Sequence, residues 1–244
     1  MQLSDITVVL PTLNEEKNIG NFLASLPDRC HLILVDAGDD NTAEIVARRR
    51  SPEFTQVVRL KSSISEARQI GAELAGTEWL LFTDADVVFG PAYFRVLSRY
   101  AGFDCIYGPK LSRTRFRRYY RWFAGGQWLS HKMGIPAASG SNLLVRRDIV
   151  AAAGGFDPDL VCNEDSELAW RIKRAGYRIA FAADLPVYAT DHRRLERGMF
   201  RKTFHSVFRC LFLYCGLIPA RWRKLDWGYW SQAHPGENRV SAQD

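Results

Sequence analysis

The sequence predicts an α/β fold in which a mostly parallel sheet is flanked by helices. Short apolar, β-branched runs alternate with segments of helical periodicity through residues 6–83. Polar and acidic residues follow these runs, as they do at the carboxyl ends of parallel strands. The chain has 244 residues, 47% of them apolar, which is enough to bury a full core in one larger domain and excludes global disorder.

The first predicted strand is Ile6 to Leu10, an apolar run that stops at Pro11 as a fully buried parallel strand would. A helix should follow, because Asn14 can cap it and apolar residues then repeat at helical spacing. The same alternation predicts strands at 32–35, 54–60 and 79–83 and helices at 42–49 and 65–75. Asp40 and Asn41 are expected to cap the helix at 42–49. Strands joined in this way require right-handed crossovers.

The second half is less regular. It predicts a basic aromatic helix near 115–131, a Gly/Ser loop at 138–142, a strand at 143–146, a helix at 164–175 and a strand at 179–182. A helical C-terminal extension is expected at 196–232. Residues 233–244 have the composition of a disordered tail.

The charge balance favours an anionic partner, since the net charge is +6 and the pI is near 9.2. The five cysteines form no C-x-x-C pair, which favours a reducing compartment. The N-terminus lacks the features of a signal peptide, and the apolar run at 207–220 is shorter than the roughly 20 residues of a spanning helix. We therefore expect a cytoplasmic protein, with peripheral attachment to the inner face of the membrane as an open alternative.

Acidic residues gather at the ends of the predicted strands, at 11–15, 36–40 and 84–86. Asp84 and Asp86 follow a buried strand and precede another apolar run, so their like charges lie close together. A hard divalent cation would relieve the repulsion, and Mn²⁺ or Mg²⁺ would complete its shell with substrate phosphates. A D-x-D tripeptide is common, however, so the pair alone does not define a metal site.

Five ordered segments carry a family resemblance. They are PTLNEE, LVDAGDDNT, ARQIGAELA, TDAD and NEDSELAWRIKRAG. With them the chain resembles family 2 glycosyltransferases of the GT-A (Rossmann-like) fold, from Ile6 to about Arg194. The resemblance implies a GT-A catalytic domain at 1–195, divided into a nucleotide-sugar-binding half at 1–110 and an acceptor-side half at 111–195.

The resemblance also implies roles for single residues on the donor side. Those expected to form the floor of the nucleotide site are Pro11, Thr12, Asn14 and Glu15. Asp36 would accept a hydrogen bond from the base, with Asp39 beside it, although turn formation is the alternative for both. Arg68, in the first turn of its helix, would face the donor phosphates, with a solvated surface arginine as the alternative. Asp84 would touch the ribose and the metal, and Asp86 would bind the metal.

On the acceptor side, Glu164 and Asp165 offer the catalytic base. A helix N-terminus favours their ionised form, and the resemblance selects Asp165. The alternative is that both acids only favour the helix start. The loop at 139–142 would approach the transferred sugar. Trp170 and Arg171 would contact sugar and phosphate, and the alternative is that Trp170 packs in the core and Arg171 lies on the surface.

His192 lies where some relatives place a third metal ligand, although a lone histidine is more often structural. The implied reaction is a single in-line displacement with inversion, in which Asp165 deprotonates an acceptor hydroxyl. The expected donor is a UDP-, GDP- or dTDP-sugar. For the acceptor hydroxyl, a saccharide, a lipid-linked carrier, a small molecule and a protein all stay open.

Two other functions are weighed against this one. A sugar-phosphate nucleotidyltransferase would carry a Gly-rich basic loop after the first strand, where this chain has PTLNEE. A non-enzymatic basic module would bind nucleic acid or membrane through Arg113 to Arg121, which leaves the acidic strand ends unexplained. We expect no nucleic-acid partner. Contact with an anionic membrane through Arg113 to Arg121 and Phe200 to Leu217 stays open, with packing on the core or on a second subunit as the alternative.

Overall fold

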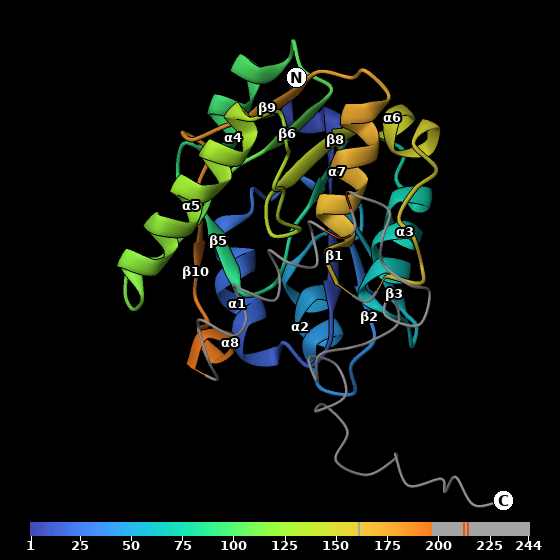
Figure 1. Cartoon of the computed structure of the whole chain (residues 1–244). Coiled ribbons are helices and arrows are strands. Elements are labelled where there is room, and N and C mark those ends of the chain that lie inside the picture. The colour runs from blue at the N-terminus through green and yellow to red at the C-terminus, as the bar shows by residue number, and fades with distance from the viewer. Residues whose placement is uncertain (161, 197–211, 213, 215–244) are drawn as a thin grey trace, which may run out of the picture.

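The computed structural model describes residues 1–160, 162–196, 212 and 214. A central sheet lies between two layers of helices, and a smaller sheet flanks it (Figure 1). Within these residues, no helix is long and apolar enough to cross a membrane.

The main sheet has seven strands in the order β3-β2-β1-β4-β8-β6-β9. Their bounds are β1 Ile6–Thr12, β2 His31–Asp36, β3 Thr55–Arg59, β4 Trp79–Phe82, β6 Cys105–Tyr107, β8 Leu143–Arg146 and β9 Ile179–Phe181. The strands β1 to β4 pair in parallel, and β6 pairs in parallel with β9. β8 runs antiparallel to its neighbours β4 and β6. The predicted mostly parallel sheet is therefore confirmed, with β8 as the reversed strand among the seven.

Helices cover both faces of this sheet. α1 (Glu16–Ser25) and α2 (Thr42–Arg49) pack on one face, and α3 (Ile64–Leu74), α6 (Arg147–Ala152) and α7 (Glu164–Arg174) pack on the other. The alternation of side chains along a strand explains the two cores. Val8 joins the α1 and α2 core while Val9 joins the α3 and α7 core, and both are fully buried.

A second sheet of three short strands has the order β5-β10-β7. These strands are β5 Val87–Phe89, β7 Lys110–Leu111 and β10 Val187–Ala189. The long helix α5 (Arg117–Lys132) packs beside β7. The remaining elements are η1 Leu3–Asp5, α4 Tyr93–Val96, η2 Leu97–Tyr100 and α8 Arg193–Glu196. None of the three short strands was predicted as an element.

Three local predictions are wrong. β1 does not stop at Pro11 but continues to Thr12. The pairing of β4 with β1 ends at Val9, so on the β4 side the missing N–H of Pro11 leaves no hydrogen bond of the sheet unmade. Asn14 does not cap α1; it adopts a left-handed conformation with φ 55°, and Glu15 occupies the N-cap position. Arg68 is the fifth residue of α3 and so lies in its second turn. The predicted helical extension at 196–232 falls almost wholly outside the described residues, and the tail at 233–244 falls wholly outside them.

Candidate active site

The carboxyl ends of β1, β2 and β4 meet at one edge of the sheet, where the chain order reverses between β1 and β4. Thr12 and Asp36 are register partners there, and the Thr12 hydroxyl donates to Asp36 Oδ1 over 2.7 Å. Asp36 also accepts from the backbone N–H of Gly38, over 3.3 Å. Burial raises the pKa of Asp36, although the Thr12 hydrogen bond opposes this rise. Open α/β sheets bind ligands at this kind of position, at the carboxyl ends of the strands where the strand order reverses.

The loops after β1 and β2 are tied to each other. Asn14 Oδ1 accepts from the backbone N–H of Asp39 over 3.0 Å, and a Cβ at Gly38 would lie 2.6 Å from the Asn14 nitrogen. A glycine is therefore required where these loops approach. The Asp39 carboxylate is exposed and pairs with Lys61, while Glu15 accepts from Asn18 and Arg193. Pro11 is buried in β1.

Arg68 lies at the centre of a buried ionic cluster. Its side chain is 2% exposed, which contradicts the alternative of a solvated surface arginine. One guanidinium nitrogen lies 3.0 Å from Asp84 Oδ1, and the other pairs with Glu164. Because a Cβ at Gly140 would overlap this guanidinium, the glycine in the Gly/Ser loop makes room for it. The structure thus brings together Arg68, Asp84 and the acidic start of α7.

The loop at 138–142 links Asp84 to Asp165, the predicted base. Ser141 donates its hydroxyl to Asp84 Oδ2, and the backbone N–H of Gly140 donates to Asp165 Oδ2. The backbone N–H of Ser166 donates to the other oxygen, Asp165 Oδ1, over 2.6 Å. Asp84 and Asp165 are therefore linked through the two adjacent residues Ser141 and Gly140.

Glu164 and Asp165 differ in their surroundings. Glu164 is 4% exposed and pairs with Arg68, whereas Asp165 is half-buried. Burial raises the pKa of Glu164 to about 7 against the opposing charge of Arg68, and burial likewise raises the pKa of Asp165. The physical reason is burial, which the single guanidinium of Arg68 offsets only in part because it faces three carboxylates, those of Asp84, Glu164 and Asp165.

Asp86 pairs with a residue that sequence reasoning missed. Both of its carboxylate oxygens accept from Lys110 Nζ, at 2.9 and 3.0 Å. Asp86 is buried, with 8% of its surface exposed. Lys110 lies in β7, whose pairing with β10 positions it, and a two-residue strand leaves no periodic signal in the sequence.

His192 is surrounded by hydroxyl and aromatic side-chain groups. Its Nε2 is 3.1 Å from the Thr114 hydroxyl, its Nδ1 is 3.4 Å from the Tyr120 hydroxyl, and its ring contacts Phe116 and Tyr120. Burial lowers the pKa of His192, so the neutral ring is favoured. In the part of the chain that the structure describes, no three His, Cys, Asp or Glu side chains gather where they could hold a metal ion. His192 is thus not gathered with Asp84 and Asp86 into a preformed three-ligand site.

The two further residues of α7 have different surroundings. Arg171 pairs with Glu167 and donates to the carbonyl oxygens of Ala153 and Gly155, so it ties α7 to the turn after α6. Trp170 is half-buried, and its ring lies 4.9 Å from that of Tyr214.

The α/β sheet, its order and its acidic edge define the GT-A class of fold. Residues 4–209 match the model of the family described as "Glycosyltransferase like family 2". The chain belongs to this family, as the five sequence segments implied.

Curated relatives include the succinoglycan biosynthesis protein ExoA of Rhizobium meliloti (strain 1021), which is 27% identical over 196 residues, covering 70% of this chain and 59% of the relative. The probable glycosyltransferase YdaM of Bacillus subtilis (strain 168) is 29% identical over 209 residues, covering 74% of this chain and 49% of YdaM. The chain thus spans about half the length of the curated relatives it matches.

Two solved structures share the fold. The mannosyltransferase PcManGT of Pyrobaculum calidifontis, in complex with GDP-Man and Mn²⁺, has a TM-score of 0.63 at 21% identity over 78% of this chain and 58% of its own. S. aureus TarS 1-349 in complex with UDP-GlcNAc has a TM-score of 0.63 at 20% identity over 79% of this chain and 59% of its own. The similarity to these structures shows the GT-A-like fold.

Proposed function

We propose that this chain transfers a sugar from a nucleoside-diphosphate sugar to an acceptor hydroxyl, with inversion and with help from a divalent metal ion. One observation carries the proposal: a single loop, 138–142, holds Asp84 on the donor side and Asp165 at the start of α7. An in-line displacement needs a leaving-group site and a base on opposite sides of the anomeric carbon, held in fixed relation to each other.

The donor nucleotide would lie over the joined ends of β1 and β2. Thr12 fixes the rotamer of Asp36, whose carboxylate would accept from the base, and Asn14 holds the Asp39 loop beside it. Pro11 and Glu15 would complete the floor. The solved relatives in complex with GDP-Man and UDP-GlcNAc support a donor of this class.

The residues present fit a hard divalent cation. Asp84 and Asp86 supply carboxylate oxygens, and each already faces a cationic side chain, Arg68 and Lys110 respectively. This pairing supports the proposal, because both acids lie where a neighbouring positive charge stabilises them. Mn²⁺ or Mg²⁺ bound to both acids and to the donor diphosphate would act as a Lewis acid that stabilises charge on the leaving nucleotide. His192 would join this set only by exchanging its hydroxyl partners.

Asp165 would take the proton from the acceptor hydroxyl. Its raised pKa makes it a stronger base than an exposed aspartate, and the Gly140 and Ser166 amides fix its direction. Glu164 would act through Arg68, as a positioning residue. Arg68 in turn would orient Asp84 and add positive charge near the donor phosphates.

The family membership and the acidic edge argue against the two rival functions. A nucleotidyltransferase phosphate loop is absent after β1 among the described residues, where Asn14, Glu15 and Glu16 stand instead. A purely basic binding module would not need the buried ionic cluster around Arg68, which costs desolvation.

Slow hydrolysis of a donor panel tests the proposal without knowledge of the acceptor, because water can replace the acceptor hydroxyl. Purified protein with Mn²⁺ would be incubated with UDP-GlcNAc, UDP-glucose, GDP-mannose and dTDP-glucose, and released nucleoside diphosphate measured. Asp165→Asn should lower the rate on the order of 10²- to 10⁴-fold with little change in the KM for the donor.

Asp148→Asn is the matched control, since Asp148 is exposed at the opposite end of the strands, where it pairs with Arg146. Asp148→Asn should leave both the rate of donor hydrolysis and the KM for the donor unchanged. A loss confined to the KM of Asp165→Asn would refute the role of Asp165 as base.

A further inference from the structure

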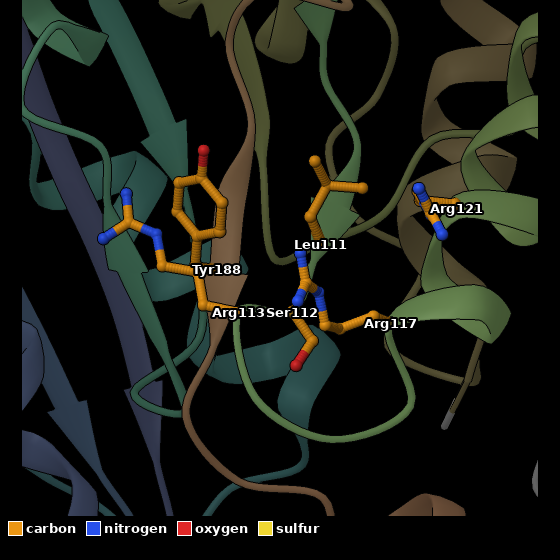
Figure 2. A pocket seen from close by; sticks show the side chains of 6 residues that line it. All are labelled: Leu111, Ser112, Arg113, Arg117, Arg121 and Tyr188. Atoms are coloured by element: carbon orange, nitrogen blue, oxygen red, sulfur yellow. The ribbon is translucent and has the colours of Figure 1, made fainter.

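A pocket of about 300 Å³ lies between the small sheet and α5. Its lining consists of Leu111, Ser112, Arg113, Arg117, Arg121 and Tyr188. Figure 2 shows Arg113 beside the Tyr188 ring and Arg117 and Arg121 reaching in from α5. The volume is at the lower end of the range for ligand pockets, which suits a small group rather than a whole nucleotide sugar.

The pocket is separate from the donor acids. Tyr188 and Leu111 are register partners in β10 and β7, so they point to the same face of the small sheet. Lys110 precedes Leu111 and points to the other face, where it pairs with Asp86. The pocket therefore opens on the face of the small sheet away from the Lys110–Asp86 pair.

The three arginines of the pocket carry uncompensated charge. No acidic side chain lines the pocket, and in the described chain none of the three forms a salt bridge, whereas the neighbouring Arg115 pairs with Glu196. Arg117 and Arg121 stand four residues apart on α5, a spacing at which like charges repel. The Arg113 guanidinium lies 3.9 Å from the centre of the Tyr188 ring, which holds it in place.

We propose that this pocket binds the phosphate or diphosphate group of the acceptor, so that the acceptor of the proposed glycosyl transfer is a phosphorylated molecule. Arginine presents a planar fork of donors that matches phosphate oxygens, and three such forks in one cavity provide more charge than a carboxylate ligand would need. Ser112 and Tyr188 add hydroxyl groups to the lining.

The same helix offers an apolar surface beside the pocket. Trp122, Leu129 and Met133 are 65%, 53% and 64% exposed, on the side of α5 turned away from its buried residues Tyr120 and Gln127. An acceptor whose phosphate is carried by a lipid would meet both features. A soluble phosphorylated acceptor would use the pocket alone.

Binding of inorganic pyrophosphate, measured by calorimetry in the presence of a chelator, tests the pocket. The chelator removes metal-dependent binding at the donor acids. The variant Arg117→Gln/Arg121→Gln should bind pyrophosphate at least about tenfold more weakly than the wild type. The control Arg118→Gln/Lys132→Gln removes the same charge from exposed positions of α5 that do not line the pocket, and should bind like the wild type.

Vesicles distinguish the two sources of the phosphate. Retention on phosphatidic acid vesicles, but not on phosphatidylcholine vesicles, that is lost in the pocket variant and kept in the control assigns a lipid-borne phosphate. Pyrophosphate binding without such retention assigns a soluble phosphorylated acceptor. Equal behaviour of the pocket and control variants, or a wild type with no affinity for pyrophosphate or phosphatidic acid, overturns the proposal.

This inference rests on the proposed function only in assigning the bound phosphate to the acceptor of a glycosyl transfer. Wild-type protein that releases no nucleoside diphosphate from any donor would refute the transfer reaction. It would leave the pyrophosphate measurement, made without metal or donor, to decide on the pocket by itself.

Discussion

At the scale of single residues, the site is short of positive charge. Arg68 is the nearest cation to Asp84 and Glu164, and its charge also acts on Asp165. A carboxylate cluster with one guanidinium holds protons more tightly than separate carboxylates do, which places Glu164 close to half-ionised near neutral pH. The same shortage would favour the divalent metal ion that we propose for this edge of the sheet.

The raised pKa of Glu164 predicts a pH dependence of stability. Because the folded state binds this proton more tightly than the unfolded chain does, the free energy of unfolding should fall as the pH rises from about 4.5 through about 7. Between pH 5 and 8 the wild type should therefore lose more stability than Glu164→Gln, by a few kcal/mol at most, since one pKa unit is worth about 1.4 kcal/mol.

Chemical denaturation of both proteins in a chelator measures this difference. The lowered pKa values of His131 and His192 act in the opposite direction, but they cancel between wild type and variant. If the free energies of unfolding of wild type and Glu164→Gln change in parallel with pH, the Glu164 pKa is not shifted. A wild type that gains stability relative to the variant would show that Arg68 lowers it.

Lys110 predicts a competition at Asp86. The Lys110 ammonium group donates hydrogen bonds to both carboxylate oxygens of Asp86, so a divalent cation that binds Asp86 must displace it. Lys110→Met should therefore tighten Mn²⁺ binding in the presence of nucleotide by about tenfold, or about 1.4 kcal/mol. Electron paramagnetic resonance of free Mn²⁺ provides the measurement, and Lys17→Met, an exposed lysine of α1, is the control.

The opposite outcome has a clear meaning. If Lys110 supplies the charge that a metal would supply, Lys110→Met weakens nucleotide binding in the presence of a chelator and Mn²⁺ affinity does not rise.

At the scale of elements, one aspartate joins two helices of the donor half. Asp40 Oδ2 accepts from the first backbone N–H of α1, on Glu16, and Oδ1 accepts from the first N–H of α2, on Thr42, both over 2.9 Å. The expected capping of α2 by Asp40 is confirmed, and the cap of α1 that was expected from Asn14 comes instead from this distant residue. Asn41, the N-cap of α2, makes no side-chain capping bond.

Asp40→Ala should accordingly lower the free energy of unfolding by about 1–2 kcal/mol, because it leaves the first amides of two helices without a partner. Asn41→Ala, one residue further on, should cost less than about 0.5 kcal/mol. Urea unfolding followed by circular dichroism compares the two. Equal losses would show that the Asp40 bonds contribute nothing beyond a surface contact.

The elements that sequence predicts well are those with a long periodic signal. The strands β1 to β4 and the helices α2 and α3 were predicted to within two residues, because the apolar period is clear there. β5, β7 and β10 have two or three residues each, too few for a period, and only their pairing in space defines them. Lys110 was missed with β7 for this reason.

The candidate site divides in the same way. Asp36, Asp84 and Asp86 could be placed at one edge because the ends of parallel strands meet there. The contact between Arg68 and Glu164 joins residues that are 96 apart in the sequence. His192 lies beside the hydroxyl groups of Ser112 and Thr114, which are 80 and 78 residues away from it in the sequence. No local pattern encodes such pairs, so the roles of these residues depended on family resemblance.

At the scale of the whole molecule, the chain order places the proposed donor and acceptor functions on different parts of one sheet. β1 to β4 and their helices build the edge at which we propose that the nucleotide binds, whereas β8 and the start of α7 supply the loop and the acid at that edge. We propose that this division corresponds to the halves 1–110 and 111–195. The reversed strand β8 brings the loop at 138–142 to the same edge as Asp84, because it runs antiparallel to β4.

The central claim is that a metal-assisted nucleotide site lies at this edge, and calorimetry of UDP, GDP and dTDP with and without Mn²⁺ tests it most directly. The account predicts that at least one nucleotide binds with Mn²⁺, that Asp86→Asn weakens this binding at least about tenfold, and that Asp165→Asn leaves it unchanged. Asp148→Asn serves as the control for a lost surface charge. Nucleotide binding of equal strength in a chelator, in Mn²⁺ and in Asp86→Asn would contradict it.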